Sequence, residues 1–159
     1  MVKVLFVCHG NICRSPMAKY VFKKIICDMK LDHLFSCDSR GVSDVCQGDS
    51  MDLRSAKILK KYGYPFDNHC AKKILLEDLL TYDYILIMDE LNQKHLYQMF
   101  NRNIQHGKVF KLLFFVPNYQ RSDIADPYYT LDFETCYEDI YKGINEFLRF
   151  LNSKNDEHK

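Results

Sequence analysis

A cysteine and an arginine that can act together stand six positions apart near the start of the chain, in the run C-H-G-N-I-C-R-S-P that begins at Cys8. A thiolate is a strong nucleophile, and nearby cations and helix N-termini favour it over the thiol. The guanidinium of Arg14 is a planar fork of donors that can bind two phosphate oxygens at once, which a lysine cannot match. The pair therefore indicates nucleophilic attack by Cys8 on a bound phosphate group. The alternative is a buried structural cysteine beside a surface arginine.

This run lies between an expected strand and an expected helix. Residues 2–8 are apolar, aromatic and β-branched, which is typical of a buried strand, and apolar residues recur at helical spacing in the segment that follows the run. Ser15 is a good N-cap and Pro16 suits the first helical position, so the helix is expected to begin at Pro16. Gly10 is expected to adopt a backbone conformation barred to other residues, and Asn11 tolerates a left-handed one. The backbone N–H groups of such a turn point at one spot and bind an anion.

With the downstream run D-P-Y-Y at residues 126–129, the nonamer resembles the low-molecular-weight protein tyrosine phosphatases, and the resemblance covers nearly the whole chain. It implies hydrolysis of phosphotyrosine and small aryl phosphates through a cysteinyl-phosphate intermediate, with phosphotyrosine proteins as substrates. Cys8, Arg14 and Asp126 take the catalytic roles. It also implies a phosphotyrosine protein phosphatase I-like α/β fold, in which a four-stranded parallel sheet of strand order 2-1-3-4 carries helices on both faces.

Asp126 is the candidate general acid. A phenolate leaves a phosphoester readily at neutral pH only if a nearby acid protonates its oxygen, and a carboxyl group on a loop can do this. Asp126 lies in a proline-containing loop, residues 122–130, between the last expected strand and the last expected helix. Pro127 limits the freedom of that loop, and Tyr128 and Tyr129 are expected to wall the cleft and stack on a substrate ring. Taken alone, the run is typical of a turn with surface tyrosines.

The resemblance gives binding and supporting roles to further residues. The loop amides from His9 to Ser15 bind the phosphoryl oxygens, and the Ser15 hydroxyl eases departure of the thiolate. The expected substrate-binding residues are His9, Gly10, Asn11, Ile12, Cys13, Ser15, Val45, Tyr128 and Tyr129. The residues expected to support the loop are Ser39, His69 and Asp89. The alternative for Ser39 is an ordinary turn serine, and His69 is better explained as a scaffold or surface histidine than as a catalytic one.

Three residues depart from the family pattern. Val45 stands where the family usually presents an aromatic ring to the substrate, His9 replaces an apolar residue, and Arg40 replaces a small one. Ile12 bears on substrate choice, because some bacterial members that act on phosphoarginine carry threonine at this position. Ile12 therefore favours phosphotyrosine.

Cys13 is a candidate redox partner of Cys8. It lies five residues from Cys8 inside one tight loop, and an exposed thiolate is the kind of sulfur that oxidises first. Family members with this second cysteine are reversibly inactivated by a disulfide within the loop. The alternative is that Cys13 packs under the loop as a small apolar residue.

Two other functions compete with phosphotyrosine hydrolysis. Arsenate reductases of the same fold relay a disulfide through two further cysteines a few residues apart, and no such pair lies between Cys70 and Cys136. A catalytically weak phosphate-binding module would be expected to lose Cys8, Arg14 or Asp126, and all three are present.

Composition bears on the number of domains, the partners, the location and the cofactors of the protein. The 159 residues suit a single domain, and 22 basic against 21 acidic residues argue against nucleic-acid or membrane-surface partners. No apolar stretch approaches the roughly 20 residues of a membrane span, and the first residues lack a signal peptide's cleavage region, so a cytoplasmic protein is expected. Seven cysteines, an odd number, fit reduced thiols, and neither they nor the six histidines have zinc-site spacing. We therefore expect no metal and no cofactor.

The pattern along the chain predicts four strands that alternate with helices. Strands are expected at residues 2–8, 34–39, 84–88 and 109–116. Helices are expected from residue 16 and at residues 52–62, 74–80, 91–100 and 133–151, and the polar tail 152–159 is expected to fray.

Overall fold

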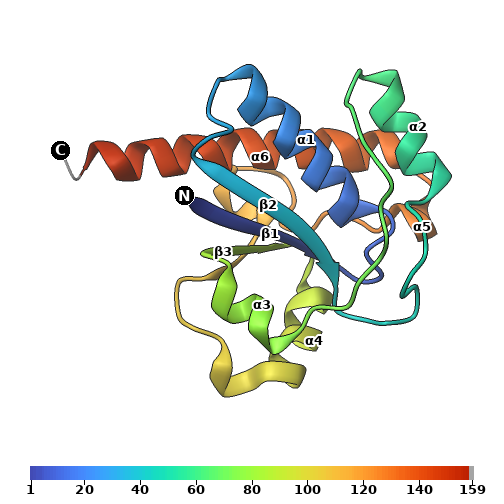
Figure 1. Ribbon diagram of the computed structural model, residues 1–159, viewed down its shortest axis with the longest axis horizontal. Coiled ribbons are helices and arrows are strands. Elements are labelled where there is room, and N and C mark those ends of the chain that lie inside the picture. The colour runs from blue at the N-terminus through green and yellow to red at the C-terminus, as the bar shows by residue number, and fades with distance from the viewer. Residues whose placement is uncertain (158–159) are drawn as a thin grey trace.

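The computed structural model describes residues 1–157 and is built around a parallel four-stranded sheet (Figure 1). Its strands are β1 (Val2–Cys8), β2 (Phe35–Gly41), β3 (Tyr84–Ile87) and β4 (Val109–Lys111), in the order β2-β1-β3-β4. Parallel neighbours require crossover connections, and in this chain helices supply them. The predicted fold class and strand order are confirmed.

Helices cover both faces of the sheet (Figure 1). One face carries α1 (Arg14–Asp28) and α6 (Phe133–Asp156), with α2 (Leu53–Lys61) packed against both, and the other carries α3 (Leu76–Thr81) and α4 (Glu90–Phe100). Shorter helical pieces are η1 (Asn101–Asn103), η2 (Leu112–Phe115) and α5 (Pro127–Thr130). Within residues 1–157, none of these helices combines the length and the apolar character that crossing a membrane would require.

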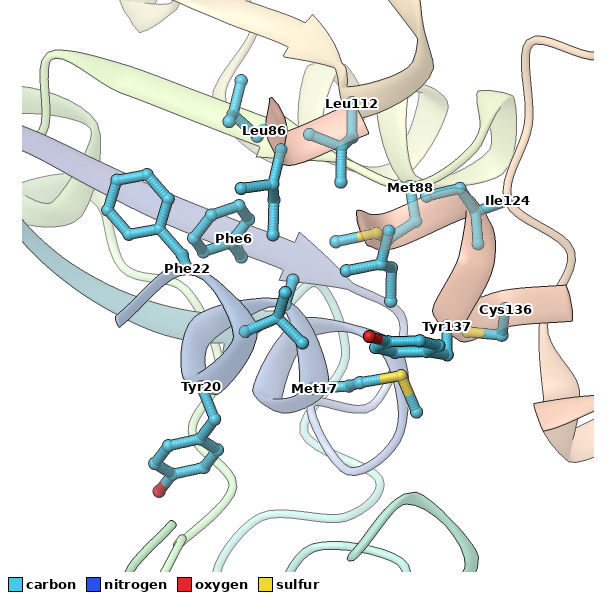
Figure 2. Packing of buried hydrophobic residues seen from close by; sticks show 14 of the residues in the cluster. Phe6, Met17, Tyr20, Phe22, Leu86, Met88, Leu112, Ile124, Cys136 and Tyr137 are labelled. Carbon is cyan, nitrogen blue, oxygen red and sulfur yellow. The ribbon is translucent and has the colours of Figure 1, made fainter. Parts of the chain in front are cut away.

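The alternation of side chains along β1 divides the interior into two cores. Val4 and Phe6 belong to the larger core, beneath α1 and α6, where Phe6 packs edge-on against Phe22 with ring centroids 5.5 Å apart (Figure 2). Leu5 and Val7 belong to the smaller core on the opposite face of the sheet. A strand buried on both faces needs apolar residues at consecutive positions, which is why β1 reads as a continuous apolar run.

The register of the strands brings their carboxyl ends to one edge of the sheet. Cys8, the last residue of β1, pairs with Gly41, the last residue of β2. Val7 pairs with Ile87, so the segment that follows β3 begins beside the segment that follows β1. Ligands of open parallel sheets bind at this edge, and the crossover order places Cys8 at its centre.

The first helix begins earlier than predicted. α1 starts at Arg14 rather than Pro16, and its N-cap residue is Cys13, which makes no side-chain capping bond. The Ser15 hydroxyl does not cap the helix, because it lies 3.0 Å from the Cys8 Sγ and accepts a hydrogen bond from the Asn11 side chain. The prediction failed because Ser15 stabilises the loop instead of the helix end.

Two other predicted boundaries were wrong. β4 ends at Lys111, which pairs with Ile87, the last residue of β3. The apolar run that follows has no strand left to pair with, and Leu112–Phe115 form the 3₁₀ helix η2. Phe114 is accordingly 65 % exposed between buried neighbours. The tail predicted to fray from residue 152 instead continues α6 through Asp156, and residues 158–159 lie outside the described part of the chain.

Candidate active site

The loop between β1 and α1 surrounds the Cys8 sulfur with hydrogen-bonding groups. Cys8 is buried, its Sγ accepts a hydrogen bond from the Asn11 backbone N–H at 3.3 Å, and it lies 3.0 Å from the Ser15 Oγ. α1 begins six residues after Cys8, so its N-terminal N–H groups and its positive dipole end lie beside the sulfur. These donors stabilise negative charge on the sulfur and on an anion bound above it.

Asn11 holds the loop in shape. Its backbone is left-handed (φ 61°), as predicted, and its side-chain Nδ2 donates to the hydroxyls of Ser15 at 2.8 Å and Ser39 at 3.0 Å. Its Oδ1 accepts from the Lys72 backbone N–H at 2.9 Å, and its carbonyl oxygen lies 2.6 Å from His69 Nε2. Burial lowers the pKa of His69, so the ring is neutral at pH 7 and donates this hydrogen from Nε2. Ser39 and His69 therefore both contact the residue that shapes the loop.

Two glycines allow the loop to pack closely against its surroundings. The expectation for Gly10 was wrong, because Gly10 lies outside the positive-φ region. A Cβ on Gly10 would lie 3.2 Å from the Cys46 sulfur, a close contact from which the Cys46 side chain would have to move slightly. Gly41 was missed by the sequence analysis. A Cβ on Gly41 would lie 2.8 Å from the His9 carbonyl oxygen, so β2 approaches the loop backbone only because this residue has no side chain.

Arg14 joins three segments of the chain beneath the loop. Its side chain is only 2 % exposed; Nη1 donates to Asp89 Oδ2 at 2.6 Å and to the Ile124 carbonyl at 2.8 Å, and Nη2 donates to Asp126 Oδ2 at 3.4 Å. Burial opposes its charge, but the negative charges of Cys8, Asp89 and Asp126 outweigh burial and raise the pKa of Arg14. The guanidinium is therefore a fixed cation directly below the anion site.

Asp126 is distant from the loop in sequence but lies beside it in the fold. It is the N-cap of α5, where its Oδ1 accepts a hydrogen bond from the Tyr128 N–H at 3.1 Å and Pro127 takes the first helical position. Its other oxygen faces Arg14, and its side chain is 22 % exposed. Tyr128 and Tyr129 are exposed, with their rings edge to face and centroids 5.3 Å apart. The carboxyl group thus reaches both the cleft and the buried guanidinium.

These residues open onto one cleft of 410 Å³. Among the residues predicted from the sequence, it is lined by Cys8, His9, Gly10, Ile12, Cys13, Arg14, Val45, Asp126, Tyr128 and Tyr129. Asn11 and Ser15 are buried beneath it instead. Cys46, which with Val45 stands where the family usually presents a ring to the substrate, also lines the cleft. Asp49 lines it too and was missed by the sequence analysis, because it lies in an irregular polar segment.

Cys13 is buried but reaches the same cleft as Cys8. Its carbonyl oxygen accepts a hydrogen bond from the Ser55 hydroxyl at 3.3 Å. Burial, followed by the negative charges of Asp52, Cys8 and Asp126, raises the pKa of Cys13 to about 12. Cys13 is therefore a protonated thiol at neutral pH.

Arg40 departs from the family pattern, and the structure explains its presence. Its Nη1 lies 2.8 Å from Asp38 Oδ2 and its Nε 3.4 Å from Asp78 Oδ2, so that the side chain ties β2 to α3. Its carbonyl oxygen accepts a hydrogen bond from the Ser15 hydroxyl at 3.3 Å. Burial opposes ionisation of Asp38, but bonds from Arg40 and the Ser39 N–H prevail and lower the pKa of Asp38 to about 2.

The cleft combines several groups that suit phosphoryl transfer. Within the described residues, no group of three or more histidine, cysteine or acidic side chains is placed to hold a metal ion. A nucleophilic sulfur, a fixed cation, a ring of backbone donors and a carboxyl group meet in one cleft. Such a set can transfer a phosphoryl group to sulfur and protonate the oxygen that leaves.

Comparison with known proteins agrees with this geometry. The model of the family described as low molecular weight phosphotyrosine protein phosphatase matches residues 3–157. The protein of that name from Gallus gallus is 39 % identical over 147 residues, which cover 91 % of this chain and 92 % of the relative. The crystal structure of YfkJ from Bacillus subtilis superposes with a TM-score of 0.92 at 33 % identity, covering 97 % of this chain and 96 % of that one. The structure of DARP, a Drosophila arginine phosphatase, gives a TM-score of 0.85 at 29 % identity, with 94 % and 98 % covered.

Proposed function

Because this chain belongs to the low molecular weight phosphotyrosine protein phosphatase family and is a protein tyrosine phosphatase, we propose that it hydrolyses phosphotyrosine through a cysteinyl-phosphate intermediate on Cys8. The observation that carries this mechanism is that Cys8, Arg14 and Asp126 line one cleft, with the carboxylate of Asp126 3.4 Å from Arg14. The substrates are proteins with phosphotyrosine and small aryl phosphates.

In the first step the Cys8 thiolate attacks phosphorus in line with the oxygen that leaves. The S–P bond forms as the P–O bond breaks, and the electron pair of that bond goes to the phenolic oxygen. Asp126 gives its proton to this oxygen, so a neutral phenol departs. Arg14 and the loop N–H groups bind the three phosphoryl oxygens, on which charge is spread in the transition state.

In the second step water replaces the cysteine. The Asp126 carboxylate takes a proton from a water molecule whose oxygen attacks phosphorus, and inorganic phosphate is released. The electron pair of the S–P bond returns to the Cys8 sulfur. The Ser15 hydroxyl lies 3.0 Å from this sulfur and can turn its hydrogen to it from the Arg40 carbonyl. Ser15 thereby makes the sulfur a better leaving group. Ser39 and His69 support this geometry through Asn11, and Asp89 supports it through Arg14.

The lining of the cleft supports an aryl group as the part of the substrate that leaves. Ile12 offers an apolar contact in the cleft, and the exposed tyrosines Tyr128 and Tyr129 offer it two aromatic rings. Val45 also lines the cleft but supplies no ring. Phosphoarginine is the competing substrate, given the structural similarity to DARP, and Ile12 is the residue that argues against it.

Reversible oxidation at Cys13 is part of this proposal. Peroxide converts the Cys8 thiolate to a sulfenic acid and is itself reduced to water. The Cys13 sulfur then attacks the Cys8 sulfur, an S–S bond forms, and a second water leaves. The two cysteines share one cleft, which supports this step, while the high pKa of Cys13 predicts that the step is slow at neutral pH.

The location that we propose is the reducing cytoplasm. It is supported by the seven cysteines, all of which are unpaired in the structure.

Arsenate reduction is the less supported alternative. It needs two relay cysteines beyond Cys8, whereas Cys70 is exposed on a loop and Cys136 is buried on α6. A phosphate-binding module without activity would not require the carboxyl group of Asp126 in the cleft.

The decisive experiment is an assay of the purified protein in EDTA on p-nitrophenyl phosphate, phosphotyrosyl peptides and phosphoarginyl peptides, with arsenate reduction measured in parallel. We expect release of phosphate from the aryl substrates, and no turnover by Cys8→Ser, which should still bind them. Trapping during turnover should add one phosphate to the peptide that contains Cys8. Near-native activity in Cys8→Ser, or arsenate reduction as the dominant activity, would refute the mechanism.

A further inference from the structure

A buried carboxylate outside the cleft anchors the segment that carries the general acid. Asp139, on α6, is only 1 % exposed, and both of its oxygens accept hydrogen bonds. Oδ1 accepts from the Tyr119 hydroxyl at 2.6 Å and from Arg121 Nη2 at 3.0 Å, and Oδ2 accepts from Arg121 Nε at 2.9 Å. The two bonds to Arg121 form a bidentate pair, which fixes orientation as well as distance.

Arg121 lies five positions before Asp126, so its pair with Asp139 sets where the acid-bearing segment begins. Residues 116–126 contain no helix and no strand, and therefore no ladder of backbone bonds holds them. At the other end of the span, the Ile124 N–H donates to the Met88 carbonyl at 2.9 Å, and the Ile124 carbonyl accepts from Arg14 at 2.8 Å. Between these points the Asp123 carboxylate accepts from the Glu90 N–H at 3.2 Å and pairs with Lys111 at 3.0 Å. The Arg121–Asp139 pair is the anchor that ties the segment to α6.

The space behind this segment gives it somewhere to move. A pocket of 120 Å³ is lined by Arg121 and Ala125 of this segment and by Cys136 and Asp139 of α6, among other residues. Ala125 is the residue next to Asp126. If the Asp139 pair is lost, the segment can shift toward α6, and a shift of about 1 Å in a reacting group can cost up to a hundredfold in rate.

We propose that Asp139 is a positioning residue for the general acid, and that through Arg121 it holds Asp126 where its carboxyl group meets the leaving oxygen above Cys8. This inference rests on the proposed function. It predicts that loss of the pair impairs proton donation while the nucleophile and the phosphate-binding loop remain intact, because Asp139 contacts neither of them.

The test compares kcat/KM, which reports the first chemical step, for phenyl phosphate and 2,4-dinitrophenyl phosphate. Phenolate needs the acid to leave and dinitrophenolate does not. Asp139→Asn and Arg121→Gln should each lower kcat/KM for phenyl phosphate about tenfold or more. They should lower kcat/KM for 2,4-dinitrophenyl phosphate less than about twofold. In an Asp126→Asn background the same changes should have no further effect, since they act through a group already removed.

The matched control is Tyr64→Phe, which removes the buried 2.7 Å hydrogen bond between Tyr64 and Tyr137 of α6 without touching the acid-bearing segment. It should leave the ratio of the two kcat/KM values unchanged. Three outcomes would each overturn the proposal. They are an equal loss of kcat/KM on both substrates, an undiminished loss in the Asp126→Asn background, and native kinetics in a folded Asp139→Asn. If Asp139→Asn does not fold, Arg121→Gln tests the proposal by the same criteria. The Arg121 side chain is 37 % exposed, so its replacement should disturb folding less. A wild type without Cys8-dependent phosphatase activity would instead refute the proposed function.

Discussion

The guanidinium of Arg14 lies 3.4 Å from the carboxylate of Asp126, although 111 residues separate them along the chain. The cation that is expected to bind phosphate therefore also holds the group that is expected to protonate the leaving oxygen. A second carboxylate, Asp89, takes the other side of the same guanidinium at 2.6 Å. Movement of Arg14 would displace both the bound phosphate and the acid.

We expect Asp126→Ala to slow turnover about 10²- to 10⁴-fold on substrates with poor leaving groups, which is the usual range for loss of a general acid. The loss should shrink as the leaving group becomes a weaker base, because such a group departs without a proton. Rates measured over a series of substituted phenyl phosphates would check this. A loss that is the same for every leaving group would indicate that Asp126 has a structural role through Arg14.

Replacement of Val45 by tryptophan should lower KM for aryl phosphates. Val45 lies in the cleft but offers no ring, and an added aromatic contact contributes about 0.5 to 1.5 kcal/mol. KM should fall for p-nitrophenyl phosphate, and inhibition by inorganic phosphate, which has no ring, should not change. An unchanged KM would mean that Tyr128 and Tyr129 already provide the full stacking contact.

Wild type should recover activity after peroxide, and Cys13→Ser should not. The proposed disulfide with Cys13 would protect Cys8 from irreversible oxidation. Because the pKa of Cys13 is raised to about 12, the linkage should form faster at pH 9 than at pH 7. Activity after dithiothreitol and the mass of the loop peptide provide the readout. Equal recovery in both proteins, with no linked peptide, would exclude Cys13 as the redox partner.

Stability should fall in acid as Asp38 becomes protonated. Its pKa is about 2 in the folded protein against an ordinary value of 3.8, so its contribution is complete above pH 4 and is lost as the pH falls toward 2. The difference in unfolding free energy between wild type and Asp38→Asn should therefore shrink from pH 5 to pH 2 in urea titrations. Asp28→Asn is the control, because its partner Lys24 lies on an exposed helix face. A difference for Asp38→Asn that is independent of pH would contradict this assignment.

Local signals in the sequence predicted the alternation of strands and helices and most of the cleft, whereas the strand order followed from the resemblance to the family. The apolar run of β1, the loop motif and the proline after Asp126 each specify their own segment, and parallel topology then brings Cys8 and Asp89 to one edge of the sheet. The start of α1 was missed for a tertiary reason: Ser15, a good N-cap by type, bonds to the loop instead.

The parts that could not be predicted depend on residues distant in sequence. Arg40 is explained by Asp78, 38 positions away, and Arg121 by Asp139 on another element. The end of β4 depends on the length of its neighbour β3 rather than on its own apolar run. Gly10 and Cys46 pack together so closely that a Cβ on Gly10 would lie 3.2 Å from the Cys46 sulfur, a relationship that neither residue reveals alone.

The contact between Gly41 and the loop joins two backbones directly. The Val42 N–H donates to the Cys8 carbonyl at 2.9 Å and the Ser43 N–H donates to the His9 carbonyl at 3.0 Å, while Gly41 packs against the same loop. β2 is an edge strand, the place where a sheet opens first, and its end cannot separate without breaking these bonds. The edge of the sheet and the nucleophile loop thus form one cooperative unit of local unfolding, and the Val42 and Ser43 amides should exchange with deuterium together, more slowly once phosphate is bound.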